Sequence, residues 1–238
     1  MRIIYISDVH NEVYNKNSLL EIPADTGAVL VVAGDINVKG RTVQDLEAVA
    51  GNFKAVVAVL GNHDWWYLAL HETHKFETDV PNLHILREET IKIDDVTFCG
   101  TTLWHDIPPA LEWDWRQRMM DGKKIRGYNY HRLSPNTITA MYRKALDFIR
   151  DCKSIKGKKV LVTHMGMSFK SIHPMYEHAS TNDFYTSAND ALLEGFTYHF
   201  HGHVHQEMSY ETFGCKVLVS PLGYPGERIS YVHQKCFI

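Results

Sequence analysis

The stretch "AVVAVLGNHDWW" (residues 55–66) joins a continuous apolar run to a glycine, an amide, an imidazole, a carboxylate and two indoles. An apolar run bounded by glycine is typical of a short β-strand that is covered on both faces. A turn residue is enough to end such a strand, and a turn does not require Asn62, His63 and Asp64 side by side. Whether these residues mark a site depends on how the other strands of the chain end.

Further short runs with the same character predict four more strands. They are "RIIYI" (2–6), "AVLVVA" (28–33), "KVLVT" (159–163) and "TYHFH" (197–201). Helical periodicity lies between several of the runs, over residues 41–53 and 134–153, and Ser134 followed by Pro135 predicts the start of the second helix. The alternation of strands with helices predicts an α/β fold in which crossover helices cover a sheet.

Other segments favour antiparallel pairing. Residues 82–101 predict a meander with a turn at Asp94-Asp95, and residues 208–220 predict a hairpin that turns at Phe213-Gly214. Residues 104–134 follow no clean period and predict a lid-like excursion over one edge of the domain. Because the chain has no internal repeat and no linker, we expect residues 1–238 to form a single domain.

Composition limits the function classes. With 45% hydrophobic and 22% charged residues, the chain is typical of a soluble globular protein. A net charge of −3 gives no strong signal for nucleic-acid binding. Four cysteines without a CxxC spacing predict reduced thiols, and no apolar window predicts a leader or a membrane span, so we expect a cytoplasmic protein.

Polar ligand-type residues follow every one of the five buried runs. These residues are Asp8 and His10, Asp35, Asn62 to Asp64, His164, and His203 and His205. In an open α/β sheet, ligands bind outside the carboxyl ends of the strands, so we expect these side chains to converge. Burying such groups without a compensating charge costs several kcal/mol each, and divalent cations supply that charge. A nitrogen and oxygen ligand set without thiolate fits Mn²⁺, Fe²⁺ or Zn²⁺, and the number of ligands suits two ions that share a carboxylate.

The ordered blocks D-x-H, GD, GNHD, H and GHxH resemble the calcineurin-like metallophosphoesterase family, and they span residues 8 to 205. The resemblance implies a four-layer α/β/β/α sandwich of two mixed sheets flanked by helices. It implies two divalent metal ions, with Mn²⁺ first and Fe, Zn or Mg as alternatives. The implied ligands of the first ion are Asp8, His10 and His205, those of the second are Asn62, His164 and His203, and the implied bridging carboxylate is Asp35.

The same resemblance implies the catalytic roles. His63 is the family's histidine that binds no metal and protonates the leaving oxygen, while a hydroxide between the two ions attacks phosphorus in line. Asp64 is expected to hold the His63 ring in its working tautomer. Trp65, Trp104 and His105 are expected to contact the substrate, whereas Trp66 is expected to be a packing residue. His71 and His74 are expected on a helix surface, and His233 has no motif support.

Departures from the family's branches narrow the function. The chain lacks the "DRG" that follows the second block in serine/threonine protein phosphatases, reads "DVHNE" rather than "DVHG", and has Asp64 where those enzymes carry Glu. We therefore expect a phosphodiesterase or phosphomonoesterase that acts on a small or nucleotide-like phosphate ester. A nuclease acting on short oligonucleotides and a non-catalytic scaffold of the same fold remain the alternatives. The loops 104–134 and 165–190 are expected to decide the substrate, and the sequence does not indicate an oligomeric state.

Overall fold

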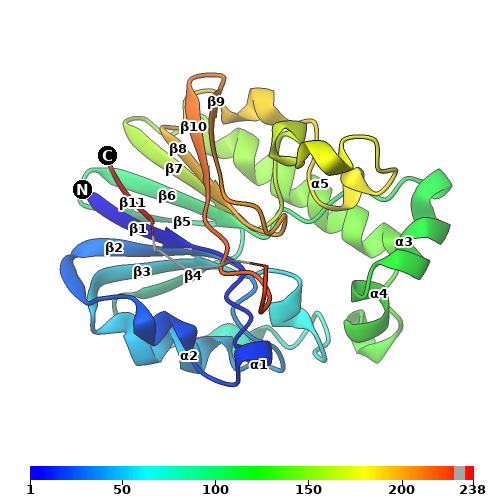
Figure 1. Cartoon of the computed structure of the whole chain (residues 1–238), viewed down its shortest axis with the longest axis horizontal. Helices are drawn as coiled ribbons and strands as arrows, with labels where there is room; N and C mark the ends of the chain where they lie inside the picture. The colour runs from blue at the N-terminus through cyan, green and yellow to red at the C-terminus, as the bar shows by residue number, and fades with distance from the viewer. Residues whose placement is uncertain (228–233) are drawn as a thin grey trace.

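Two β-sheets face each other in the computed structural model, and helices cover the outer face of each sheet (Figure 1). The structure describes residues 1–227 and 234–238, so His233 lies outside the described residues. The first sheet has five strands in the order β11-β1-β2-β3-β4, and the second has six in the order β5-β6-β7-β8-β10-β9. This arrangement confirms the predicted α/β/β/α sandwich.

The elements have the following bounds. The first sheet contains β1 (Arg2–Ile6), β2 (Asp25–Ala33), β3 (Phe53–Val59), β4 (Leu83–Leu86) and β11 (Gln234–Phe237). The second contains β5 (Glu89–Ile93), β6 (Val96–Thr101), β7 (Lys158–Thr163), β8 (Tyr198–His201), β9 (Met208–Thr212) and β10 (Cys215–Val219). The α-helices are α1 (Asn11–Tyr14), α2 (Thr42–Ala50), α3 (Glu112–Arg118), α4 (Asp121–Lys124) and α5 (Pro135–Cys152). The 3-10 helices are η1 (Ser18–Glu21), η2 (His63–Trp65), η3 (Thr73–Phe76), η4 (Pro109–Leu111), η5 (Tyr128–Tyr130), η6 (Phe169–Ser171), η7 (Pro174–Tyr176), η8 (Asn182–Phe184) and η9 (Asp190–Leu193).

The continuous apolar runs are explained by the two cores. Val29 and Val31 of β2 pack between the sheets, in the cluster that also contains Phe98 of β6. Leu30 and Val32 of the same strand belong to the cluster that includes Leu46 and Val49 of α2, on the outer face. Because both faces of the central strands are covered, neither face needs polar residues.

Helix α5 begins as the sequence predicts. The Ser134 hydroxyl accepts a hydrogen bond from the backbone N–H of Thr137 at 3.1 Å, and Pro135 occupies the first turn. The apolar stripe of the helix, which includes Ile138 and Ile149, is buried. The helix lies over the outer face of the six-stranded sheet (Figure 1).

Two strand predictions need correction. Residues 82–101 do not form one meander, because β4 pairs in parallel with β3 in the first sheet while β5 and β6 form a hairpin in the second. The chain changes sheets after Leu86, where Glu88 has a φ of 56°. Strand β11, which sequence analysis missed, pairs antiparallel with β1. In the β4–β3 and β11–β1 pairs, packing of the side chains in the sheet determines which strands pair, and the local sequence pattern does not.

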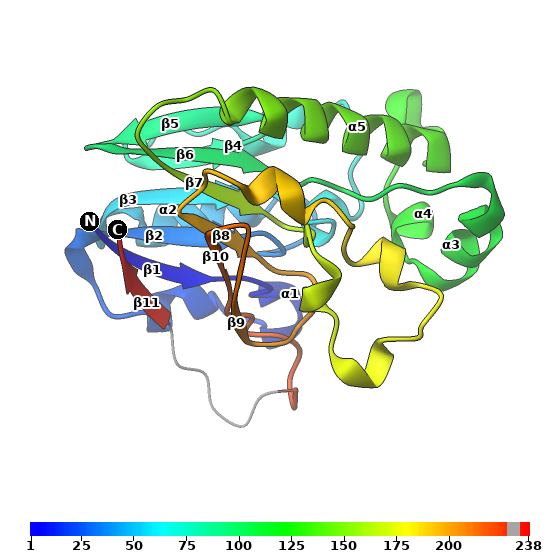
Figure 2. The same cartoon turned by 90° about the horizontal axis from the view of Figure 1, so that it is seen from above.

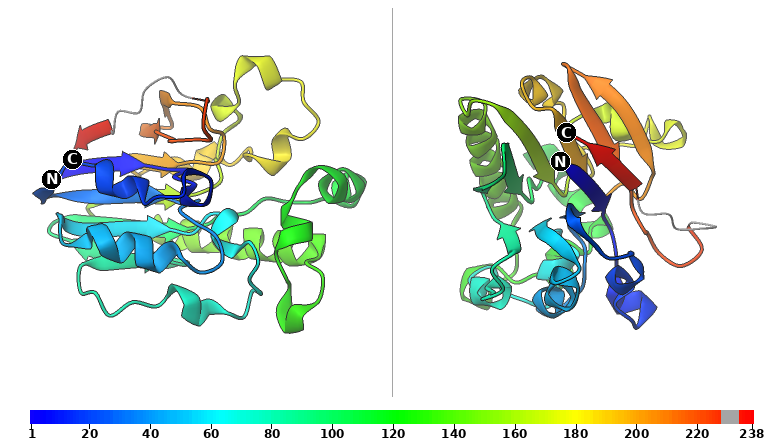
Figure 3. Two further views of the ribbon diagram at one scale, coloured as in Figure 1. Left: turned by 60° about the horizontal axis from the view of Figure 1, so that its bottom comes forward. Right: turned by 90° about the vertical axis from the view of Figure 1, so that its left-hand side faces the viewer.

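Two long segments gather at the end of the sandwich where the parallel strands finish (Figures 2 and 3). One is the 104–134 excursion, which contains α3 and α4 rather than an unstructured loop. Pairs of oppositely charged side chains four residues apart, such as Asp114 and Arg118, support α3. The other is 165–190, with η6, η7 and η8. Both segments therefore lie beside the strand ends that carry the polar residues.

Candidate metal centre

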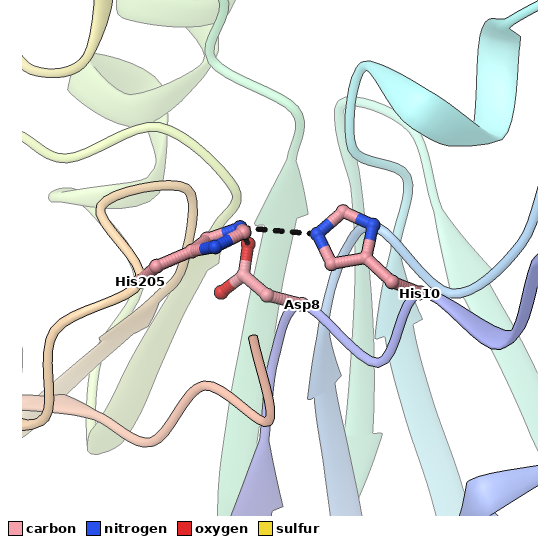
Figure 4. A group of neighbouring side chains, drawn as sticks. All are labelled: Asp8, His10 and His205. Carbon is pink, nitrogen blue, oxygen red and sulfur yellow. Dashed lines mark hydrogen bonds and ion pairs between the residues drawn. The ribbon is translucent and has the colours of Figure 1, made fainter. Parts of the chain in front are cut away.

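Three overlapping sets of potential metal ligands lie at the carboxyl ends of the strands. In each set, every residue offers one ligand atom within 4.8 Å of the others; the sets are Asp8, His10 and His205 (Figure 4), then His10, Asp35 and His63, and then Asp35, His164 and His203. Asp35 is shared by the last two sets, so we call Asp8, His10 and His205 the first group and His164 and His203 the second group. The amide oxygen of Asn62 lies 3.1 Å from Nε2 of His164, beside the second group. The residues predicted as metal ligands therefore converge, although strands of both sheets supply them.

Asp35 lies between the two groups. Its Oδ1 is 3.3 Å from Nε2 of His164, and its Oδ2 is 3.8 Å from Nε2 of His10. The two oxygens of one carboxylate thus face opposite groups. Burial opposes ionisation, but the neighbouring His164 and His63 rings hold the pKa of Asp35 well below its usual range.

Hydrogen bonds at Nδ1 leave Nε2 of His10 and His205 as the candidate metal-ligand atoms. Nδ1 of His10 lies 3.2 Å from the Glu12 carboxylate and Nδ1 of His205 lies 2.7 Å from that of Glu227. An ionised carboxylate only accepts, so each Nδ1–H donates, and each Nε2 carries a lone pair when its ring is neutral. The two Nε2 atoms lie 3.0 Å apart, and either a proton or a cation between them relieves the repulsion of two lone pairs (Figure 4).

The second group has the same property. Nδ1 of His164 donates to the carbonyl of Ala33 at 2.9 Å, which leaves Nε2 as the ligand atom. Nε2 of His203 is buried and has no hydrogen-bond partner among the described residues. Burial lowers the pKa of His164, but the Asp35 carboxylate outweighs that effect and raises it to about 9. Both groups therefore attract positive charge, and their donor atoms fit divalent cations.

The backbone is bent at the ligands. Left-handed φ values occur at Asp8 (50°), His10 (47°), Asp35 (55°), His203 (67°) and His205 (49°). Such values are uncommon for residues other than glycine and cost about 1–3 kcal/mol each, so they persist only where the surroundings enforce them.

Two glycines make room for the carboxylates. A Cβ on Gly61 would overlap Oδ1 of Asp35, and a Cβ on Gly202 would lie 2.6 Å from Oδ2 of Asp8. The glycines that precede Asn62 and His203 are therefore required by the close approach of two ligand loops.

The amide of Asn62 is oriented by a residue that sequence analysis missed. Its Nδ2 donates to Oδ1 of Asp121 at 2.9 Å, and the indole N–H of Trp66 donates to the same oxygen at 2.9 Å. Asp121 is 1% exposed and belongs to the 104–134 excursion. With Nδ2 held in this way, the amide oxygen of Asn62 points to the second group.

The prediction that Asp64 orients the His63 ring is wrong. The Asp64 carboxylate accepts hydrogen bonds from the backbone N–H groups of Asp35, Ile36, Asn37 and Gly61 and from the hydroxyl of Thr42. It therefore joins the second and third sequence blocks. The two side chains diverge because His63 and Asp64 are successive residues of the 3-10 helix η2, where adjacent side chains do not face each other.

Glu12 is the residue that holds His63. Nδ1 of His63 donates to Oε1 of Glu12 at 2.8 Å, and the hydroxyl of Tyr224 lies 3.3 Å from Nε2. Burial opposes ionisation, but hydrogen bonds from His10 and His63 lower the pKa of Glu12 to about 2. The sequence signal was the departure "DVHNE", in which an acid follows His10 by two residues.

Three predicted substrate contacts are also wrong. Trp65 is 5% exposed and packs edge-on against Phe76, with ring centroids 4.8 Å apart. Trp104 and His105 are buried, and neither lines the cavity beside the ligand groups. Trp66, which was expected to be a packing residue, lines that cavity and stacks on His63 with centroids 3.3 Å apart. The turn of η2 places Trp65 in the core and Trp66 at the site.

A cavity of about 510 Å³ opens beside the ligand groups. Its floor includes Asp35, Asn62, His63, His203 and His205. Its walls come from both long segments, with Arg118 to Asp121 from the 104–134 excursion and residues that include Ser171, Ile172, Tyr176 and Tyr185 from the 165–190 segment. The arrangement leaves space for a ligand next to the metal ligands and next to His63.

Comparisons with known proteins agree with this geometry. Residues 1–233 match the calcineurin-like phosphoesterase superfamily domain, so the chain belongs to that family of metal-dependent phosphoesterases. The uncharacterized protein L509 of Acanthamoeba polyphaga mimivirus is 23% identical over 97% of this chain and 94% of its own length.

Two solved structures share the fold. The phosphopantetheinyl hydrolase PptH from Mycobacterium tuberculosis has a TM-score of 0.72 at 16% identity, over 94% of this chain and 90% of its own. GAP50, the anchor in the inner membrane complex of Plasmodium, has a TM-score of 0.50 at 14% identity, over 92% of this chain and 70% of its own. Across the described residues, no helix has the length and apolar character needed to cross a membrane.

Proposed function

We propose that this protein hydrolyses a phosphate diester or monoester of a small or nucleotide-like molecule with the help of two divalent cations. The observation that carries the proposal is Asp35, whose two carboxylate oxygens face two separate groups of ligands beside an open cavity. We assign Asp8, His10 and His205 to the first ion, Asn62, His164 and His203 to the second, and Asp35 to both. The nitrogen and oxygen donors are compatible with Mn²⁺, which we propose first, and with Fe, Zn or Mg as alternatives.

When bound, the cations supply Lewis-acid chemistry, which acidifies water and neutralises charge on the phosphate oxygens. The chain supplies the geometry for that chemistry. Carbonyl and carboxylate partners of the histidine ligands hold their Nε2 atoms toward the cavity floor. Asp121 holds the Asn62 amide in the same way. Such outer partners fix the orientation and raise the basicity of metal ligands.

His63 is positioned to give a proton to the leaving oxygen. Nδ1–H of its ring is held by the Glu12 carboxylate, so a protonated ring presents Nε2–H to the cavity. The same hydrogen bond fixes the orientation of the ring, and the hydroxyl of Tyr224 lies 3.3 Å from Nε2. When the bond between phosphorus and the leaving oxygen breaks, the proton moves from Nε2 to that oxygen and leaves a neutral imidazole.

The alternatives receive less support. A non-catalytic scaffold does not need the seven ligand positions that converge here. A short oligonucleotide carries several phosphates, and among the described residues Arg118 is the one lysine or arginine that lines the cavity. We also propose that residues 1–238 act as a single domain, since β11 near the end of the chain pairs with β1.

The test is hydrolysis of matched aryl phosphate diesters and monoesters by metal-stripped protein, with Mn²⁺, Mg²⁺, Zn²⁺ or Fe²⁺ added back. We expect turnover that depends on the added ion and saturates at two ions per chain. Turnover of the diester identifies a phosphodiesterase, and turnover of the monoester alone identifies a phosphatase. Absence of turnover on both esters with two ions bound contradicts the proposal and favours the scaffold.

A further inference from the structure

We propose that the outer part of the cavity is a subsite for an uncharged, largely apolar group attached to a single phosphate. The inference rests on the proposed function for the place of the phosphate, and it adds the class of substrate. It depends on three features of the cavity walls: the apolar part of their surface, the single arginine available for a second phosphate, and the partners of the Trp66 ring.

Apolar side chains contribute part of the cavity walls, beside polar ones. Met119 and Met120 face the cavity from the link between α3 and α4, and Ile172 and Tyr176 face it from the 165–190 segment. Met120 is 41% exposed and Tyr176 is 56% exposed, so apolar surface is open to a ligand. Methionine side chains adapt their shape to apolar ligands, and exposed apolar surface of this kind commonly marks a binding site.

The cavity lining contains few cationic side chains that could bind a second phosphate. In the part of the chain that the structure describes, Arg118 is the one lysine or arginine that lines the cavity. Its Nε donates to Asp114 at 3.2 Å, so one of its five N–H donors is already used. The acids Asp121 and Glu227 line the same cavity and would repel a polyphosphate. Recognition of a further phosphate normally uses several arginine or lysine donors.

The rings beside the centre are already stacked. Trp66 has His63 against one face, with centroids 3.3 Å apart, and Nζ of Lys124 over its ring at 3.5 Å. Tyr185 stacks on His203 with centroids 5.0 Å apart at 29°. A nucleobase is usually held by stacking on a free aromatic face. Trp66 therefore does not provide a platform for a base next to the phosphate.

The volume agrees with a group of moderate size. At about 510 Å³, the cavity lies within the range of roughly 300–1,000 Å³ found for sites that enclose a small organic ligand. Ser171, Thr181 and Asn182 add uncharged hydrogen-bonding groups to the lining. The subsite thus fits an uncharged chain that carries few polar atoms, joined to the phosphate at the metal centre.

The experiment measures binding separately from turnover. Calorimetric titration of the Mn²⁺-loaded protein compares methylphosphonate, hexylphosphonate and thymidine monophosphate in the form of its 5′-phosphonate analogue, none of which has a phosphate ester bond that the protein could hydrolyse. We expect hexylphosphonate to bind at least about tenfold more tightly than methylphosphonate, because each buried methylene contributes about 0.8 kcal/mol. We expect the thymidine phosphonate to bind less tightly than hexylphosphonate.

Variants locate the effect. Met120→Gln and Ile172→Asn are each expected to reduce the hexyl preference by about threefold to tenfold and to leave methylphosphonate binding unchanged. Met175→Gln is the matched control, because Met175 is 71% exposed and does not line the cavity. Equal affinities for methylphosphonate and hexylphosphonate, a preference for the thymidine phosphonate, or variants that behave like the control would each overturn the subsite. Hexyl preference without turnover of any ester supports the subsite and contradicts only the proposed function.

Discussion

Oε1 of Glu12 lies 2.8 Å from Nδ1 of His63 and 3.2 Å from Nδ1 of His10. One carboxylate therefore holds both a proposed metal ligand and the proposed general acid. The 4.4 Å separation of the two ring centroids follows from this shared partner. Glu12 thus ties the geometry of proton transfer to the geometry of the metal centre.

Glu12→Gln is expected to keep the size of the side chain and to weaken the charge-assisted hydrogen bond that holds the His63 ring. We expect kcat to fall by about 10- to 100-fold on alkyl esters with poor leaving groups and much less on nitrophenyl esters. Metal content, measured by elemental analysis, should remain at the wild-type level. Glu21→Gln, at an exposed acid paired with Lys16, is the control. His63→Ala should show the same dependence on the leaving group with a larger loss, and an equal loss on all esters in either variant contradicts the acid role.

Asp35→Asn is expected to lower the bound metal below two ions per chain. The variant keeps the size of the side chain but loses the charge and one of the two oxygens that face the ligand groups. Elemental analysis after dialysis against Mn²⁺ provides the measurement, and Asp79→Asn at an exposed position provides the control. Two ions retained in Asp35→Asn would exclude the bridging assignment.

Asp121→Leu is expected to weaken metal binding because it removes the acceptor that orients the Asn62 amide. The loss of such an outer partner typically costs 10- to 100-fold in metal affinity. Asp121→Asn keeps an acceptor oxygen and should lose far less, which makes it the matched control. Calorimetric titration with Mn²⁺ measures both variants. If the two variants lose the same affinity, the orienting role of Asp121 is wrong.

The buried histidine at 105 is expected to make stability depend on pH. Burial lowers the pKa of His105 to about 3, against an unfolded value near 6.5, and its ring nitrogens have no hydrogen-bond partners among the described residues. Between these values the unfolded chain binds the proton and the folded chain does not. Above pH 6.5 the ring is neutral in both states, and burying it costs no proton. As the pH falls from 6.5 toward 3, the unfolded chain gains a proton that the folded chain does not, so the free energy of unfolding decreases.

His105→Phe is expected to remove this dependence. The free energy of unfolding of the wild type, relative to the variant, should fall by about 2–3 kcal/mol between pH 7.5 and pH 4.5. Urea denaturation of metal-stripped proteins at both pH values provides the measurement. A parallel pH dependence in the two proteins would show that His105 has the same pKa in the folded and the unfolded chain.

Local patterns predicted the strands and the helices that bear most on the site. The apolar runs of β1, β2, β3, β7 and β8 and the capped start of α5 appear where the sequence indicates them. These features depend on neighbours along the chain, such as the Ser134 cap. Strand β4 pairs in parallel with β3 of the first sheet. The sequence predicted that it would instead pair with the strands that follow it directly, because neighbours in sequence often pair.

The sequence by itself determined that a carboxylate, amide or imidazole group follows each buried run, because strand order in an α/β sheet brings such ends to one edge. Only the tertiary structure decided which groups serve the site from outside those blocks. Glu12 reaches His63 across 51 residues of sequence, and Asp121 reaches Asn62 across 59. The 3-10 turn at His63–Trp65 directs Asp64 toward backbone amides, Trp65 into the core and Trp66 into the cavity. Side-chain direction in a tight turn and contact between distant loops are set by packing, and neither leaves a periodic signal in the sequence.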